Sequence, residues 1–112
     1  MQDGLYHRDI FLPIRLGFAA FVKYSAHARQ AAQDDRYGAL TLPAVISTQE
    51  ADVIEVEVVN GKPHKAVLRM RHDDERDLCV VVLLDTCVVK TVWCNLRTDT
   101  HGTLDRTKYM AA

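Results

Sequence analysis

The sequence predicts an α+β fold in which one or two N-terminal helices pack on a four-stranded antiparallel meander sheet. Three observations predict this class: an alanine-rich segment with a helix cap and a glycine stop, four later segments with strand character, and turn signals between them. With 112 residues, 48% of them hydrophobic, the chain is expected to form one domain over residues 1–112. We expect an N-terminal arm over 1–17, helices over about 25–48, a sheet over about 53–95 and a polar C-terminal segment over 96–112.

The segment SAHARQAAQDDRYG predicts the first helix, over residues 25–37. Ser25 is a suitable N-cap, alanines fill the interior, and Gly38 is a typical stop. In the segment TLPAVISTQEAD, Thr41 can cap and Pro43 can open a second, shorter helix. The N-terminal half of the sequence therefore supplies the helical layer.

The segments VIEVEVV (53–59) and KAVLRMR (65–71) predict the first two strands, because apolar residues alternate along both. Asn60-Gly61 between them is a strong turn signal. Two antiparallel strands place their apolar residues on one face only if the loop has an odd number of residues or the pair contains a bulge. A three-residue loop that begins at Gly61 would place Glu55 opposite Arg69.

The segment DLCVVVLLD (77–85) is apolar on both faces, which predicts a central strand. CVVKTVWCN (87–95) is expected to return as its antiparallel partner after a tight turn at Asp85-Thr86. The cysteines in these strands, three in all, are expected to be reduced and packed. No CxxC or HxxxH spacing occurs, so we expect no metal and no cofactor.

We expect no secretion signal, because no apolar run follows a charged region in MQDGLYHRDIFLPIRL. The longest uninterrupted apolar run, Leu78–Leu84, is too short to span a membrane. We therefore expect a cytoplasmic protein, in the host cytoplasm if it is phage-encoded. Residues 10–24 contain Pro13 and Gly17, so we expect an irregular extended segment that ends in a short strand or helix start near 18–23.

Fourteen Lys and Arg against fifteen Asp and Glu give a net charge of −1, which argues against a strongly basic nucleic-acid binder but leaves room for a small basic site.

His27 lies in the first turn of the predicted helix, where the helix dipole favours the neutral imidazole that acts as a general base. The alternative is a partly buried histidine bonded to a backbone carbonyl. Arg69 and Arg71 share a strand face about 7 Å apart and could hold a phosphodiester. Their alternative is pairing with Glu55 and Glu57.

The segment KTVWCNLRTDTHGTLDRTKY, residues 90–109, is dense in hydrogen-bonding side chains. Loops after strands often carry catalytic groups, so His101 is a candidate general acid. Thr91 and Asn95 on the last strand are candidates for substrate binding. The alternative is that the short polar side chains in this loop hold turns through bonds to the backbone. We expect Trp93 to be a core residue and not a base-stacking platform.

The order SAHARQAAQDDRYG, paired strands and VVKTVWCN resembles a group of small bacterial and phage domains. Their signature is Ser-x-His-Ala at the start of a helix, an arginine on a middle strand, and a last strand that ends in Thr-Val-Trp-x-Asn. This group is similar in layout to the compact toxin ribonucleases of the barnase, EndoU, colicin and toxin–antitoxin type. The resemblance, which covers about residues 24–109, implies metal-independent RNA cleavage with His27, Arg69 and either Thr91 or Asn95 at the site.

Two functions from different classes follow. The first is a ribonuclease toxin, with His27 as general base, Arg69 as phosphate binder and His101 as acid; its partners would be RNA and a cognate antitoxin. The second is a non-enzymatic, phage-type inhibitor that blocks a host protein. A scaffold that was once an enzyme and has lost its activity is a third possibility. A homodimer is compatible with each of these. The enzyme needs its residues around one concave site, whereas the inhibitor predicts an exposed apolar patch or sheet edge.

Overall fold

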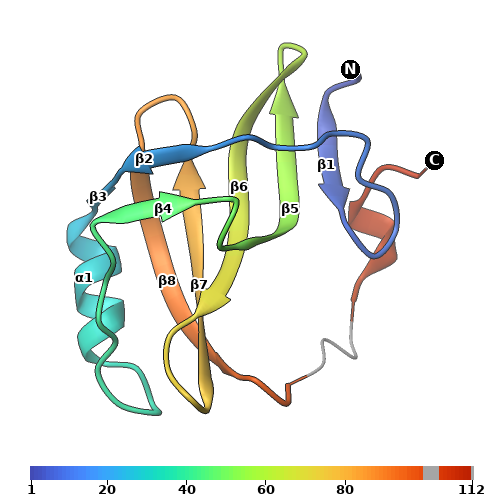
Figure 1. Ribbon diagram of the computed structural model, residues 1–112. Coiled ribbons are helices and arrows are strands. Elements are labelled where there is room, and N and C mark those ends of the chain that lie inside the picture. Colours follow the sequence, from blue (N-terminus) through green and yellow to red (C-terminus); the bar gives the residue numbers. More distant parts are fainter. Residues whose placement is uncertain (100–103, 112) are drawn as a thin grey trace.

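Strands dominate the computed structural model, which describes residues 1–99 and 104–111 (Figure 1). The elements in chain order are β1 (Gly4–His7), β2 (Ala19–Phe21), β3 (Lys23–Tyr24), α1 (Ala26–Gln33), β4 (Val45–Ser47), β5 (Asp52–Val59), β6 (Lys62–Arg71), β7 (Arg76–Leu83), β8 (Val88–Leu96) and the 3-10 helix η1 (Arg106–Lys108). One sheet has the order β1-β5-β6-β7-β8-β3, and β2 pairs with β4 in a separate two-stranded ribbon. The six-stranded sheet is mixed. β3 runs parallel to β8, and every other pair of neighbouring strands in this sheet is antiparallel.

The predicted fold class, helices on a four-stranded antiparallel meander, is therefore wrong. One α-helix occurs within the described ranges, and the four predicted strands gain β1 at one edge and β3 at the other. Both additional strands are short, and each pairs with a strand that is distant in the sequence. Local periodicity does not report such pairing, because the stabilising contacts lie across the sheet and not along the segment.

The first helix begins where the sequence predicts. Ser25 is its N-cap, and the Ser25 hydroxyl oxygen accepts a hydrogen bond from the backbone N–H of Ala28 at 3.0 Å. The helix ends earlier than predicted, with Asp34 as its C-cap. The predicted second helix is wrong, because Val45 and Ile46 lie in strand β4. Their β-branched side chains favour extended backbone, and pairing with β2 stabilises it.

The hairpin between β5 and β6 turns at Asn60–Gly61, as predicted, but with a two-residue connection. Both residues have positive φ, 53° and 74°, as in a type I′ turn. A bulge next to Glu57 then brings the apolar residues of the two strands to one face. The three-residue loop was the wrong alternative and the bulge the right one, so Glu55 lies opposite Val67 and not opposite Arg69.

The two faces of the six-stranded sheet differ in cover. We call the face that carries the core the inner face; α1 and the β2–β4 ribbon pack on it, and the ribbon crosses it in Figure 1. We call the opposite face the outer face; it carries the alternate residues of β5 to β8, including Glu55, Val67, Arg69 and Trp93. The buried cluster on the inner face includes Val56, Val58, Ala66, Leu68, Leu78, Val80, Val82, Val89, Val92, Ala28, Ala32 and Ile46.

The C-terminal segment returns to the first strand (Figure 1). The backbone N–H of Met110 donates to the carbonyl oxygen of Leu5 at 2.8 Å, and the Tyr109 hydroxyl donates to Glu55 Oε1 at 2.6 Å. Met110 therefore lies against β1 at one edge of the sheet, and Tyr109 reaches Glu55 of β5. None of the helices in the part of the chain that the structure describes is long and apolar enough to cross a membrane.

Candidate functional site

The outer face carries a charged network centred on Asp77 of β7. The Asp77 carboxylate accepts hydrogen bonds from Arg69 Nε at 2.8 Å and from Arg97 Nε at 3.2 Å. The Arg69 and Asp77 side chains are only 10% and 15% exposed, so this pair is largely removed from water. Arg97 also donates to backbone carbonyls in the turn between β6 and β7 and at the first residue of β7. The network therefore fastens the end of β8 to that turn.

The predicted site residues within the described ranges do not gather around one concave site. His27 is exposed on α1, which packs on the inner face. Arg69 projects from the outer face toward Asp77, so the sheet lies between the His27 and Arg69 side chains. Arg71 lies on the outer face with Arg69 and forms an exposed ion pair with Asp74 at 2.9 Å. These two arginines are thus paired with aspartates of β7 and the preceding turn.

Thr91 and Asn95 of β8 do share the outer face with Arg69. Asn95 Nδ2 lies 3.5 Å from Cys79 Sγ, within hydrogen-bond distance for sulfur. Burial raises the pKa of the Cys79 thiol to about 12, so this cysteine stays protonated and is a poor nucleophile. The candidate acid, His101, lies outside the described residues.

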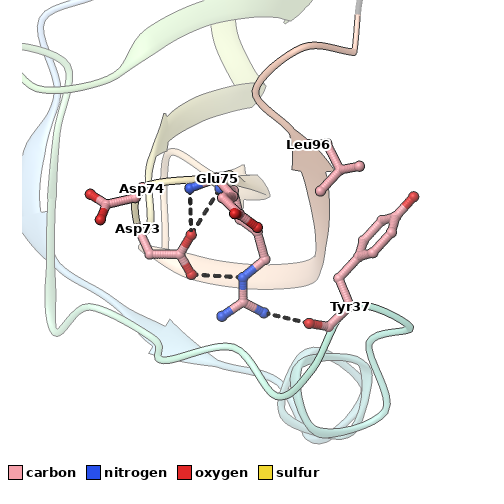
Figure 2. Close-up of a pocket in the computed structure, with 6 residues that line it drawn as sticks. Tyr37, Asp73, Asp74, Glu75 and Leu96 are labelled. Carbon is pink, nitrogen blue, oxygen red and sulfur yellow. Dashed lines mark hydrogen bonds and ion pairs between the residues drawn. The ribbon is translucent and has the colours of Figure 1, made fainter.

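A hollow of about 500 Å³ lies between the loop after α1 and the turn from β6 to β7 (Figure 2). Arg76 Nε donates to Asp73 Oδ2 at 2.7 Å, and Arg76 Nη1 donates to the carbonyl oxygens of Tyr37 and Gly38 at 3.1 and 3.0 Å. The Arg76 guanidinium, together with the backbone N–H of Glu75, holds the pKa of the Asp73 carboxyl well below its usual range. A carboxylate held in this way is a poor proton acceptor and a good structural anchor.

His72 lies beside this hollow, and both of its ring nitrogens are engaged. The backbone N–H of Thr41 donates to His72 Nε2 at 2.9 Å, which leaves Nδ1 as the donor to Asp73 Oδ2 at 3.1 Å. The His72 side chain is 10% exposed. It therefore bridges the loop before β4 to the β6–β7 turn and has no free nitrogen for catalysis.

A second hollow, of about 400 Å³, lies where the C-terminal segment meets the outer face, and Trp93 and Tyr109 line it. Burial, followed by the hydrogen bond to Glu55, raises the pKa of Tyr109 to about 12. His7 is 4% exposed, and its ring meets the edge of the Tyr109 ring with centroids 5.0 Å apart. Sequence reasoning missed this cluster, because His7 and Tyr109 lie at opposite ends of the chain. The His7–Tyr109 contact holds the two ends of the chain together, and the bond from Tyr109 to Glu55 ties the C-terminal segment to β5.

Within residues 1–99 and 104–111, the structure contains neither a disulfide bond nor a cluster of metal-binding side chains. No group of three or more His, Cys, Asp or Glu side chains in these ranges could hold a metal ion. The three cysteines are free thiols, and Cys79 and Cys94 are buried.

The ribbon carries the most exposed large apolar side chain among the described residues. Phe21 of β2 is 81% exposed, and its direct partner in the ribbon, Val45 of β4, is 48% exposed. Cross-strand partners share a face, so the two side chains point together away from the core, whereas Ile46 points into it. We call this surface, formed by Ala19, Phe21, Val45 and Ser47, the ribbon face.

Comparison of the chain with protein-family models, with curated proteins and with solved structures finds no match. The resemblance to compact toxin ribonucleases is therefore neither supported nor contradicted by a relative.

Proposed function

We propose that the chain is a non-enzymatic binding protein that docks on a partner protein through the ribbon face. One observation carries the proposal: Phe21, 81% exposed, stands beside the exposed Val45 on the outer side of the ribbon. Burial of one such side chain is worth about 1.5–3 kcal/mol. A neighbouring pair of uncovered apolar side chains is the kind of feature that a protein interface uses.

The ribonuclease hypothesis draws less support from the geometry. Two side chains on opposite sides of a sheet are poorly placed to share one phosphate, and His27 and Arg69 are arranged in this way. The Arg69 guanidinium also has the Asp77 carboxylate 2.8 Å away. That negative charge would oppose the binding of a phosphate at the same place.

Photo-crosslinking from the ribbon face tests the proposal. Phe21 is replaced by p-benzoylphenylalanine, and the protein is irradiated in a lysate of host cells. We expect one discrete protein adduct, because the side chain at position 21 would lie in the interface. Excess unlabelled wild-type protein should suppress the adduct, whereas excess Val45→Asp protein should not.

The control places the same photoreactive residue at Tyr37, an exposed aromatic outside the ribbon, which is 38% exposed. Position 37 should give no adduct of the same mass. The proposal is overturned if Phe21 gives no adduct, if Tyr37 gives the same one, or if Val45→Asp protein competes as well as the wild type. Identification of the adduct by mass spectrometry then names the partner.

A further inference from the structure

We infer that the partner contributes an extended, acidic segment that adds as a strand to the free edge of β2. This inference rests on the proposed function and adds to it the mode of binding and the chemistry of the partner. Strand addition to an exposed edge gives affinity through main-chain hydrogen bonds and specificity through alternate side chains.

The hydrogen bonds of the ribbon use only one edge of β2. The backbone N–H of Thr48 donates to the Phe18 carbonyl at 2.8 Å, and the N–H of Val22 donates to the carbonyl just before β4 at 3.0 Å. Backbone groups alternate in direction along an antiparallel strand, so those of Ala19 and Phe21 point away from β4. Of the strands that the structure describes, β4 is the one that pairs with β2. The opposite edge of β2 is therefore unpaired at Ala19 and Phe21, and it closes at Lys23, whose backbone N–H donates to the Cys87 carbonyl at 2.9 Å.

Both edges of the six-stranded sheet are protected, in contrast. At β1, the backbone N–H of Met110 donates to the Leu5 carbonyl, and the C-terminal segment lies alongside. At the other edge, β3 has two residues, and α1 follows directly, with the Ser25 N–H bonded to the Val89 carbonyl at 3.0 Å. Proteins usually shorten or cover sheet edges to prevent pairing with other chains. The unpaired edge of β2, which lies next to the exposed Phe21, is not covered in this way.

The usable edge extends beyond the three residues of β2. Exposure alternates along the preceding segment, which runs on from β2 across the sheet in Figure 1. Alternation with a period of two is the pattern of extended backbone. An added segment could thus lie along about seven residues, from Arg15 to Phe21. The exposed positions of the whole stretch are Pro13, Arg15, Gly17, Ala19, Phe21 and Lys23.

The charges along this edge specify an acidic partner. Arg15 and Lys23 are exposed on either side of Phe21, and neither forms an ion pair with a residue in 1–99 or 104–111. Side chains directly opposite on neighbouring strands lie about 5 Å apart, and opposite charges there are favourable. We therefore expect a segment with an apolar residue facing Phe21, a carboxylate facing Arg15, and a second carboxylate at the end that lies next to Lys23, just beyond the paired stretch. A basic segment would be rejected by the same charges.

Selection from a phage-displayed library of random dodecapeptides tests this inference. We expect the selected peptides to alternate apolar and acidic residues and to lack proline in their centres. Their affinity, measured by calorimetry with synthetic peptides, should fall about tenfold or more with Phe21→Asp or Arg15→Glu, which corresponds to about 1.4 kcal/mol. Arg36→Glu, a charge reversal on an exposed residue after α1, is the matched control and should leave affinity unchanged.

Peptide N-methylation then tests the strand geometry. Methylation of alternate backbone amides should abolish binding in one parity and spare it in the other, because every second N–H faces β2. Peptides that need Phe21 but tolerate N-methylation at every position would overturn strand addition and leave the proposed function intact. If no selected peptide depends on Phe21, strand addition is overturned, whereas the proposed function is overturned only by the crosslinking result at position 21. Circular dichroism of each variant verifies that it is folded.

Discussion

Asp73 is the residue on which the polar contacts of the β6–β7 turn converge. Its carboxylate accepts from Arg76 Nε, from the backbone N–H groups of Glu75 and Arg76, and from His72 Nδ1. Arg76 reaches on to the carbonyls of the loop after α1. One aspartate thus links the turn, through its partners, to the loop after α1. Its partners hold it as a carboxylate, which makes it a structural residue.

Asp73→Asn should lower the thermal stability of the protein near neutral pH. The ordinary pKa of 3.8 is lowered in the folded state, so the stabilisation is fully present above the unfolded pKa and is lost as the pH falls through the folded one. The difference in Tm between wild type and Asp73→Asn should therefore be constant above about pH 5 and shrink below about pH 4. Scanning calorimetry from about pH 7 down to about pH 2 measures this difference.

The neighbouring Asp74→Asn is the matched control. Its side chain is 97% exposed and pairs with Arg71, itself 69% exposed, and exposed pairs contribute little to stability. Its Tm should stay close to that of the wild type at every pH. An equal loss in both variants would show that the general charge of the turn, and not the set of contacts at Asp73, supplies the stability.

Partners of single residues were predictable only in part. Sequence periodicity correctly predicts that Arg69 and Arg71 share a strand face, because alternation follows from backbone geometry. It proposes glutamates of β5 as partners, whereas Asp77 and Asp74 hold them. The bulges in β5–β6 shift the register, and a bulge depends on the detailed fit of two strands.

At the scale of elements, the β5–β6 turn shows how a short sequence signal determines a connection. Asn60 and Gly61 both adopt positive φ, which their residue types tolerate best. Their backbone N–H groups donate to the Asp3 carboxylate at 2.9 and 2.8 Å. These bonds lower the pKa of Asp3 and attach the N-terminal segment to the hairpin.

Gly61→Ala should lower the free energy of unfolding by about 1 kcal/mol, because an L-residue is strained at φ of 74°. The nearest atom to an added Cβ is the Met1 carbonyl oxygen at 3.8 Å, so the cost comes from the backbone and not from a clash. Gly17→Ala is the control, since its φ is not positive and nothing lies within 4 Å of the added carbon. Urea denaturation should find Gly17→Ala as stable as the wild type or slightly more stable. Equal effects in the two variants would contradict this account of the turn.

Elements with long, regular patterns were predictable, and short ones that depend on distant partners were not. The alternation or apolar density of residues 53–95 predicts β5 to β8, and Ser25 predicts the start of α1. The threonine and proline before β4 imitate a helix start, yet Val45 and Ile46 pair with β2. β1 and β3 have four and two residues, too few for a periodic signal.

Across the whole molecule, side chains and strand edges that contact other parts of the chain can be distinguished from those that are left uncovered. The charged residues of the outer face bind one another, and the C-terminal segment covers one sheet edge. The ribbon face has neither kind of cover. Sequence reasoning could anticipate an exposed patch or edge as a class of site, but not its location, because Phe21 lies in an apolar segment that resembles a core strand. Only the packing of the ribbon determines which side chains of that segment face outward.

The same distinction predicts that Arg69 stabilises the fold and does not bind phosphate. Arg69→Ala leaves the Asp77 carboxylate, 15% exposed, with Arg97 as its remaining arginine partner. We expect the free energy of unfolding to fall by about 2 kcal/mol.

The control variant His27→Ala, at an exposed helix position, should change the free energy of unfolding by less than about 0.5 kcal/mol. Urea denaturation compares the two variants, and the same preparations are incubated with bulk RNA in EDTA. The wild type should not cleave the RNA; cleavage that both folded variants lose would instead establish a metal-independent ribonuclease and overturn the binding-protein proposal.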